Sequence, residues 1–407
     1  MNEIDFLLSI DSKKIKYGLS RTYKFLEICG NPEQSFNSIQ VVGTNGKGST
    51  SAMLAKILID NQLDTGLFTS PHLVRINERI TVNSNQIPND FIIYFIKKYK
   101  KDIISLEVSF FEIITVMAAY YFKIKDIDIA VLETGLGGRL DSVTALQSAM
   151  IIYTIINKDH SQILGNSIEK ITEEKSGAIQ THTQKIISVN QQNSVKNILN
   201  YRAKINECRI RYIESYNYRF DSLALHGMHQ QENAALAIHA IKDIQDLFFI
   251  KCNNIDKSLS NVYWPGRMQY IQNNPDVIFD VAHNEHGIEA FMNYFKLIKN
   301  KYSKSYILIG FEDSKEIDIG LKKICTYFDN ISLTETNIRS CMAISKLNDK
   351  CSLYSDHINS IKNPLEAIKY NLQQLTSSDV FVILGSHYFG PHINNIFKNC
   401  FDYNMKN

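Results

Sequence analysis

A glycine-rich segment with one lysine gives the strongest chemical signal in this sequence. Residues 41–50 read Val-Val-Gly-Thr-Asn-Gly-Lys-Gly-Ser-Thr, and they lie between a short β-type run and a helical pattern. Glycines let the backbone wrap closely around a phosphate, while the amides and the N-terminus of the helix supply the positive ends of dipoles. Lys47 adds a full positive charge. We therefore expect a phosphate cradle for a nucleotide, formed by Asn45, Gly46, Lys47, Gly48 and Ser49.

This loop differs from a standard Walker A loop. The standard pattern has a glycine five residues before the second glycine, whereas Val41 occupies that place here. A glycine-rich turn with a surface lysine is the alternative interpretation. Taken alone, the loop is compatible with a kinase, a GTPase or an ATPase.

Ionisable residues also follow two buried-strand patterns further along the chain. Glu133 closes the apolar run 127–133, and His160 comes shortly after the run 150–156. Open α/β sheets bind ligands at the carboxyl ends of their strands, and a carboxylate buried there needs a cation. The alternative for Glu133 is a helix cap or an ion pair with Arg139. Magnesium usually takes oxygen ligands, so metal chemistry by itself makes His160 a weak candidate.

The elements that position these residues alternate along the chain. A strand at 39–42, a helix at 47–61 and a strand at 65–68 form the βαβ pattern of a parallel sheet with helices on its faces. The pattern predicts an α/β fold. Further strands are expected at 127–133, 150–156 and 185–188, and a helix at 231–248.

The same alternation starts again after the turn Trp264-Pro265-Gly266. The polar residues 253–260 form the expected linker before this turn. We therefore predict a first domain at 1–262 and a smaller α/β domain at 263–407. Strands of the second domain are expected at 277–281, 306–310 and 380–385, with a helix at 289–299.

Length and composition agree with a two-domain globular protein. A chain of 407 residues exceeds the size at which one hydrophobic core usually stops growing, and 44% hydrophobic with 21% charged residues is ordinary for a globular protein. The 44 basic residues nearly balance the 42 acidic ones, so we expect no nucleic acid or membrane partner. We find no signal-peptide or membrane-span pattern. Seven scattered cysteines without a C-x-x-C pair favour reduced thiols, so we expect a cytoplasmic protein.

The Gly-Thr-Asn-Gly-Lys-Gly-Ser-Thr loop resembles that of the Mur ligases, and especially that of the folylpolyglutamate and dihydrofolate synthases. Further segments match this family in the family's order. The resemblance implies a P-loop Mur-ligase domain with a mainly parallel sheet, followed by a smaller Rossmann-like glutamate-ligase domain. The matching segments are Thr69-Ser70-Pro71-His72-Leu73 with 75–80, then 110–115, 132–141, 159–160, 173–179, 226–235, 264–268, 279–284 and 384–388.

The resemblance assigns roles to individual residues. Ser70, Glu133 and His160 would hold magnesium, and carbon dioxide would carbamylate Lys175, turning a cation into an anion that supports the metal. With Lys47, the residues Glu133, His160 and Lys175 form the implied catalytic set. The implied ATP contacts beyond the loop are Asn233, Arg267 and Asp280. The implied folate or pterin contacts are Phe111, Glu112, Ile113, Ile114, Leu140, Asp141 and Ser142.

The local sequence leaves simpler interpretations open for two of these residues. Lys175 could be a helix-surface lysine paired with a nearby glutamate, and Asn233 could satisfy backbone groups in the first turn of its helix. Some positions also depart from the family's pattern. Val281 stands where glycine is usual and restricts the backbone near the nucleotide. The other departures are Ala178, Glu285 and His387.

The activity that the resemblance implies is ATP-dependent amide ligation through an acyl phosphate, which the amino group of L-glutamate attacks. The acceptor would be 7,8-dihydropteroate, a reduced folate that already carries glutamate, or both, since the same pocket serves each activity in the family. The alternatives are a Mur-type ligase with another carboxylate acceptor and a non-catalytic nucleotide-binding relative. Segments 111–115 and 136–141 favour the pterin acceptor. The family's usual state, a monomer, is expected.

Overall fold

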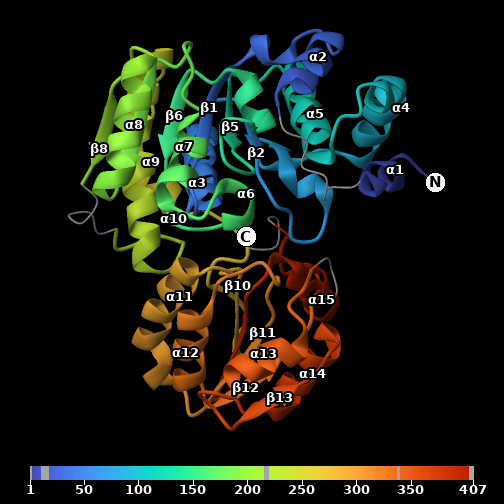
Figure 1. Ribbon diagram of the computed structural model, residues 1–407, viewed down its shortest axis with the longest axis vertical. Helices are drawn as coiled ribbons and strands as arrows, with labels where there is room; N and C mark the ends of the chain where they lie inside the picture. Colours follow the sequence, from blue (N-terminus) through green and yellow to red (C-terminus); the bar gives the residue numbers. More distant parts are fainter. Residues whose placement is uncertain (1, 11–17, 215–219, 337–339, 403–407) are drawn as a thin grey trace. The chain divides into compact units, whose positions relative to one another are not determined.

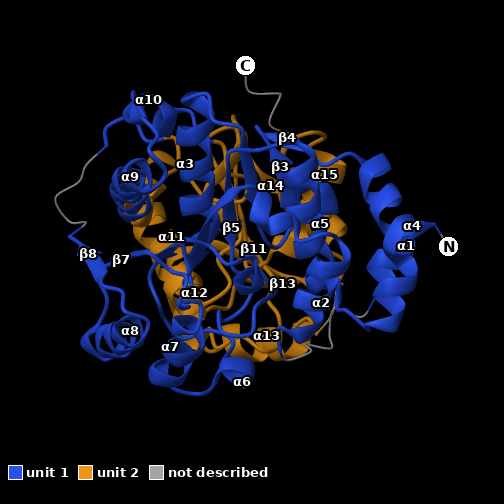
Figure 2. Ribbon diagram, turned by 90° about the horizontal axis from the view of Figure 1, so that it is seen from above, with its two compact units in different colours: residues 1–223, 231–262 blue, residues 224–230, 263–407 orange. Residues whose placement is uncertain are grey.

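The chain divides into two compact units (Figure 2). The computed structural model describes residues 2–10, 18–214, 220–336 and 340–402. The first unit contains Met1–Leu223 and Gln231–Val262, and the second contains Ala224–Gln230 and Tyr263–Asn407. The predicted first domain, 1–262, therefore includes a short segment that the structure groups with the second unit. Each unit builds a mainly parallel sheet with helices, so the predicted α/β fold is confirmed.

The described strands of the first unit form one sheet. Their order is β4 (Asn85–Gln86), β3 (Ile80–Val82), β2 (Thr65–Phe68), β5 (Ile129–Glu133), β1 (Asn37–Val42), β6 (Met150–Tyr153), β7 (Lys185–Val189) and β8 (Ile210–Ile213). From β2 to β8 the neighbouring strands run parallel, while β3 and β4 add an antiparallel edge. The carboxyl ends of β2, β5, β1 and β6 therefore lie along one edge, where open α/β sheets bind their ligands.

Helices flank the strands of this sheet (Figure 1). β1 and β5 are buried over nearly their whole length, which is typical of parallel strands that are covered on both faces. The helices are α1 (Glu3–Ser9), α2 (Ser20–Ile28), α3 (Lys47–Asp60), α4 (Asn89–Ser105), α5 (Phe110–Ile124), α6 (Ser161–Leu164), α7 (Ile168–Ser176), α8 (Asn193–Ile205), α9 (Met228–Phe248) and α10 (Ile255–Ser260), with 3-10 turns η1 (Pro32–Ser35), η2 (Ile76–Arg79) and η3 (Ser142–Leu146).

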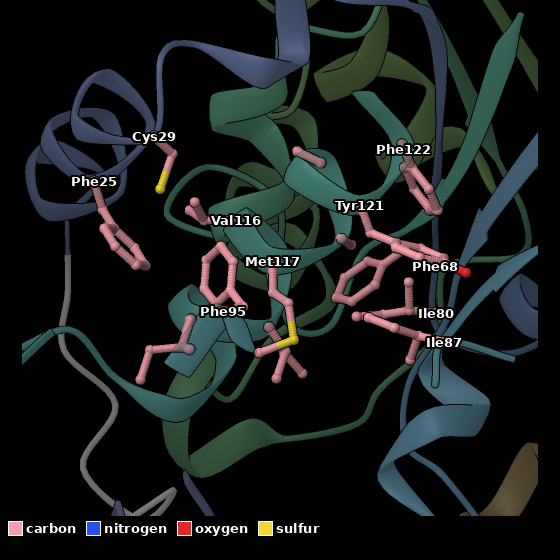
Figure 3. Close-up of a cluster of buried hydrophobic side chains, with 14 of the residues drawn as sticks. Phe25, Cys29, Phe68, Ile80, Ile87, Phe95, Val116, Met117, Tyr121 and Phe122 are labelled. Carbon is pink, nitrogen blue, oxygen red and sulfur yellow. The ribbon is translucent and has the colours of Figure 1, made fainter. Parts of the chain in front are cut away.

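A hydrophobic cluster joins α2, α4 and α5 to the sheet (Figure 3). Phe25 of α2 and Phe95 of α4 meet edge to face, with ring centroids 6.0 Å apart. Met117 and Phe122 of α5 and Phe68 of β2 are buried in the same cluster. Burial of one such side chain contributes roughly 1.5–3 kcal/mol relative to leaving it exposed. The cluster therefore fixes α5, whose first turn carries part of the predicted acceptor site.

The second unit has its own sheet and core. The strand order is β13 (Ile358–Ser360), β12 (Asn330–Leu333), β11 (Ser305–Ile309), β14 (Val380–Leu384), β10 (Asp276–Asp280) and β9 (Gln269–Gln272), and only β9 pairs antiparallel among these described strands. Ile278, Ile307 and Leu333 are buried in its core. The helices are α11 (Glu285–Ile298), α12 (Asp318–Tyr327), α13 (Ile344–Cys351), α14 (Pro364–Gln374) and α15 (Gly390–Ile396), with 3-10 turns η4 (Lys299–Lys301) and η5 (His387–Phe389).

The predicted linker at 253–260 is wrong, because Ile255–Ser260 form α10, which packs on α3. Leu259 is buried, and Ile255 lies one helical turn before it on the same face. The Asn253 amide also donates to Asn61 Oδ1 at 2.6 Å, at the end of α3. The polar residues of the segment hid a short apolar stripe, and contact with a distant helix decided its structure.

Several predicted boundaries also differ from the structure by a few residues, including one helix start and one strand end. The helix expected at 289–299 begins at Glu285, because Asn284 Oδ1 caps it by accepting from the Gly287 amide at 2.8 Å. The strand expected at 150–156 ends at Tyr153. Both differences lie at element ends, and at the start of α11 the side-chain cap explains the difference.

Within the described ranges, no helix combines the length and apolar character that crossing a bilayer requires. α9 has 21 residues but carries Glu232, Lys242, Asp243 and Asp246.

Candidate active site

The glycine-rich loop connects β1 to α3 at the carboxyl edge of the first sheet. α3 begins at Lys47, where the sequence predicts a helix to start. The Thr44 hydroxyl donates to the Asn157 carbonyl at 2.9 Å and accepts from the Asn157 amide at 3.0 Å, which ties the loop to the segment after β6. The Lys47 ammonium donates to the Thr44 carbonyl at 3.1 Å. An anion at this helix N-terminus would meet backbone amides and one lysine.

Gly46 brings this loop against α9. Its φ is +88°, and it caps α3. A Cβ atom at Gly46 would lie only 2.4 Å from Asn233 Oδ1. Asn233, one of the predicted ATP contacts, is buried, and this short distance places it beside the glycine-rich loop of the same unit.

Gly46→Ala is expected to weaken ATP binding by about tenfold or more, because alanine disfavours this backbone conformation and its methyl group would collide with Asn233. Calorimetric titration with ATP measures the effect. Gly18→Ala is the matched control, since Gly18 has a φ of +106° but no neighbouring atom within 4 Å of an added Cβ. The control should lose stability and keep its nucleotide affinity. Unchanged ATP affinity in Gly46→Ala would contradict this role of the loop.

Glu133 and Ser70 meet at the ends of two neighbouring strands. Phe68 of β2 pairs with Leu132 of β5, so the residues that follow emerge together. Glu133 is only 4% exposed, and its Oε2 accepts from the Ser70 amide at 3.0 Å. The alternative pairing of Glu133 with Arg139 is wrong, because the Arg139 guanidinium forms its ion pair with Glu174 at 2.7 Å. Glu133 is thus a buried carboxylate beside a serine.

The donor set of Ser70 and Glu133 fits magnesium. This ion takes oxygen ligands, keeps several waters and is usually held by one or two carboxylates together with substrate phosphates. In the part of the chain that the structure describes, no group of three or more His, Cys, Asp or Glu side chains is placed to hold a metal ion. A metal at this edge would therefore be completed by water and phosphate.

His160 lies at the start of α6 with a φ of +51° and 41% of its side chain exposed. Its amide donates to Asp159 Oδ1 at 2.7 Å, and the ring Nε2 is 3.9 Å from the same oxygen. The structure thus gives His160 a carboxylate neighbour. Its role as a magnesium ligand stays a prediction.

Glu78 organises the loop that carries Ser70, a role that sequence reasoning missed. Its carboxylate accepts from the amides of Leu73, Val74 and Arg75 at 2.7, 3.0 and 2.7 Å. Hydrogen bonds to an ionised carboxylate are about twice as strong as neutral ones. Glu78 occupies the third position of η2, so its place three residues after the N-cap was the available sequence signal.

Lys175 is buried in the last turn of α7, with 5% exposure. Its ammonium donates to the Gly43 carbonyl, in the glycine-rich loop between β1 and α3, at 2.6 Å. The interpretation as a helix-surface lysine is therefore wrong. Burial, reinforced by the charge of Lys47, lowers the pKa of Lys175 to about 7, although Asp159 and Asp141 oppose the shift. A large share of this amine is neutral near pH 7, unlike that of an ordinary lysine.

Asp141 holds the glycine-rich turn that follows Glu133. Its carboxylate accepts from the amides of Leu136 and Val143 at 2.7 and 2.9 Å. Burial raises the pKa of Asp141 to about 6, although these bonds and Lys47 work against the shift. Ser142, the last residue of the predicted pterin segment, shares a 2.7 Å hydrogen bond with Thr115 of α5. The turn is therefore fastened to α5.

The predicted acceptor residues of α5 have different surroundings. Phe111 is half-buried, its ring lies 5.8 Å from that of Phe68, and a Cβ at Gly135 would lie 2.4 Å from the Phe111 ring. Glu112 accepts from the Ser109 amide at 2.7 Å and completes a capping box. Ile113 and Ile114 are fully buried in the hydrophobic cluster. The structure brings Phe111 to the glycine-rich turn and places the two isoleucines in the core.

In the second unit, Asp280 is the last residue of β10, and Arg267 lies two residues before the start of the antiparallel neighbour β9. Asp280 is buried and accepts from the amides of Met268 and Ala282 at 2.8 and 2.7 Å. Burial raises the pKa of Asp280, and the neighbouring Arg267 opposes the shift. The Arg267 Nη1 donates to the Gly266 carbonyl at 3.0 Å. The bond from the Met268 amide to Asp280 thus joins the two segments that carry the predicted ATP contacts of this unit.

The structure gives the surroundings of three of the departures from the family's pattern, Val281, Glu285 and His387. Val281 is not among the described residues with positive φ, and its amide donates to the Gly266 carbonyl at 3.1 Å, so the valine adds no backbone strain. Glu285 Oε1 accepts from the Ile319 amide at 2.9 Å and links α11 to α12. The ring of His387 lies 5.7 Å from that of His283.

Comparison with known proteins supplies independent evidence. The Mur ligase, glutamate ligase domain family matches residues 266–387. Dihydrofolate synthase/folylpolyglutamate synthase of Buchnera aphidicola subsp. Schizaphis graminum is 31% identical over 86% of this chain and 85% of its own length. The Bacillus subtilis protein of the same name is 28% identical over 92% and 94%. Folylpolyglutamate synthase of Mycobacterium tuberculosis, solved with ADP, superposes with a TM-score of 0.88 at 23% identity and covers 98% of this chain and 99% of that one.

A nucleotide-type βα loop in the first unit and a glutamate ligase domain in the second define the Mur ligase class. The Buchnera protein, 31% identical over 86% of this chain, identifies the family within this class. The chain belongs to the dihydrofolate synthase/folylpolyglutamate synthase family.

Proposed function

We propose that this chain is an ATP-dependent ligase that joins the amino group of L-glutamate to a carboxylate of a pteridine acceptor. One observation carries the proposal: the phosphate loop, the Ser70–Glu133 contact and the buried Lys175 meet at one sheet edge. The names of the relatives support two acceptors, 7,8-dihydropteroate and a reduced folate that already carries glutamate.

We assign ATP and acceptor binding to 1–262 and the glutamate-ligase role to 263–407. The family match at 266–387 supports the second assignment. Asn233 and the phosphate loop support the first, because they lie together in one unit. Arg267 and Asp280 would add ATP contacts from the second unit.

The chemistry follows from the poor reactivity of a carboxylate. Transfer of the γ-phosphoryl group to one carboxylate oxygen of the acceptor forms a C–O–P linkage and releases ADP. The neutral amine of glutamate then attacks the carbonyl carbon, the C–O bond to phosphate breaks, and the amine loses a proton as the amide forms. The products are the amide, ADP and phosphate.

This chain's own residues would direct the first step. Lys47 and the loop amides would bind the phosphates and stabilise the charge that develops on them. Ser70 and Glu133, with His160 as a predicted third ligand, would hold magnesium, which neutralises phosphate charge when bound. Asp141 would keep the acceptor loop in place through its two amide bonds. Lys175, once carbamylated, would add an anion beside the loop.

The cellular setting is also part of the proposal. All seven cysteines lie in the described ranges and are free thiols, which supports a reducing compartment, and we propose the cytoplasm. We propose that the chain acts as a monomer on small molecules, without nucleic acid or membrane partners.

The test is the substrate dependence of ADP release by the purified protein. We expect release to require magnesium, L-glutamate and a pteridine acceptor together, with dihydropteroate and a reduced monoglutamyl folate assayed separately. Turnover with a cell-wall precursor and not with either pteridine would favour another Mur-type acceptor. Binding of ATP without turnover on any acceptor would favour a non-catalytic relative.

A further inference from the structure

Gln40 is a buried amide in the centre of the first sheet. It lies in the middle of β1, is 1% exposed and has the apolar neighbours Ile39 and Val41. Its Nε2 donates to Thr134 Oγ1 and to Thr144 Oγ1, both at 3.0 Å. Burying a polar group is unfavourable unless it is hydrogen-bonded, so an apolar residue would be the simpler choice for this strand. Unlike an apolar residue, the glutamine forms hydrogen bonds to two threonines.

These bonds reach both ends of a second loop, residues 134–144, which contains the glycine-rich turn after Glu133. Thr134 directly follows Glu133, and Thr144 follows the predicted acceptor segment 140–142. The Thr144 hydroxyl accepts from Gln40 and in turn donates to the Gly138 carbonyl at 2.7 Å, so it links Gln40 to the middle of the loop. One amide on β1 therefore holds the beginning, the middle and the end of the loop.

α7 holds the same loop from another side. A Cβ at Gly138 would lie 2.6 Å from the Lys175 carbonyl oxygen, so the helix backbone packs directly on this glycine. The Arg139 amide donates to the Glu174 carbonyl at 2.8 Å. Because β1 and α7 both fasten the loop, a change at either one would alter the position of the loop.

We infer that Gln40 is a positioning residue, which holds the loop 134–144 in the conformation that binds the pteridine end of the acceptor. The inference rests on the proposed function and deepens it. Gln40 acts through Thr134 and Thr144, and the predicted contacts Leu140, Asp141 and Ser142 lie between them.

Gln40→Met tests the inference, because methionine has a similar length and no hydrogen-bond donor. Loss of the two buried hydrogen bonds is expected to loosen the loop and to raise the acceptor KM by about tenfold. The KM for ATP and the kcat at saturating acceptor should stay within about twofold. Thr144→Val should reproduce the effect and Thr144→Ser should largely restore it. The effects of Gln40→Met and Thr144→Val should not add, because the residues belong to one network.

Ser38→Ala is the matched control. Ser38 precedes Gln40 by two residues and so lies on the same face of β1, and its buried hydroxyl donates to Ser148 Oγ at 3.0 Å, outside the loop. The control should lower Tm and leave the acceptor KM unchanged. A Gln40→Met protein that loses Tm but keeps the wild-type acceptor KM would overturn the inference.

A second readout does not depend on activity. Amide hydrogen exchange should be faster in residues 135–143 of Gln40→Met than in wild type, and unchanged there in Ser38→Ala. Equal exchange of this segment in all three proteins would overturn the inference, even for a protein that proves inactive. Absence of acceptor-dependent ADP release in the wild type would instead refute the proposed function, so the two failures can be told apart.

Discussion

Glutamate-dependent ADP release is expected to fall by about 100-fold or more when Glu133 is replaced by glutamine. Glutamine keeps the shape of the side chain and an oxygen that can accept from the Ser70 amide, as Glu133 does at 3.0 Å. It lacks the negative charge that a divalent cation requires from this nearly buried group. Steady-state ADP release, measured across a magnesium titration, should show a lower kcat and a higher magnesium requirement.

Glu169→Gln is the control for this substitution. The same replacement of glutamate by glutamine is made here on the exposed surface of α7, within the same unit. The control should keep the wild-type rate and magnesium dependence. Both variants should keep the wild-type Tm within a few degrees, since neither change removes apolar packing. Wild-type magnesium dependence in Glu133→Gln would contradict a metal-binding role for this carboxylate.

Removal of carbon dioxide is expected to lower the activity of the wild-type protein, and added bicarbonate to restore it. Carbamylation requires a neutral amine, and the pKa of about 7 leaves roughly half of Lys175 neutral at pH 7. As the pH falls below 7 the amine is protonated and the carbamate is lost, so the bicarbonate-dependent activity should decline on the acid side. Initial rates in degassed buffers from pH 6 to about 9 measure this dependence.

Lys175→Met is expected to reduce the rate by about 100-fold and to abolish the bicarbonate response, because methionine fills the buried site but cannot be carbamylated. Lys185→Met is the control, since Lys185 is partly exposed and pairs with Asp246 at the surface. A wild-type rate that is independent of bicarbonate, together with an unmodified Lys175 in intact mass measurements, would contradict the proposed carbamate.

Much of the fold could be predicted because its signals are local. The sequence predicts the strand, turn and helix around Lys47 because apolar β-type residues, glycines and a helical pattern follow one another within one short stretch. Strands β2, β5 and β14 appear close to their predicted positions for the same reason, since each is a short apolar run ended by polar residues or glycine. α10 escaped prediction because its polar composition hid the contact with α3.

The site was less predictable because its geometry depends on contacts between distant segments. Nothing near Lys175 indicates burial, which arises when α7 packs beside the phosphate loop and the ammonium reaches Gly43. Gln40 reads locally as an ordinary strand residue, although its amide meets two threonines about a hundred positions away. The role of Glu112 in capping α5 was likewise not predicted, and its contact with the acceptor, which the family resemblance implies, stays a prediction. Such roles follow from tertiary packing, which overrides local propensity.

The most direct test of the central claim is mass spectrometry of the products formed with ATP, magnesium and L-glutamate. Purified protein would be offered 7,8-dihydropteroate or a reduced monoglutamyl folate, with a known active synthase in parallel. We predict that at least one acceptor gains the mass of a glutamyl residue, and that the acceptor or acceptors extended define the activity. If neither gains this mass while the parallel synthase extends its own substrate, the pteridine ligase assignment is contradicted.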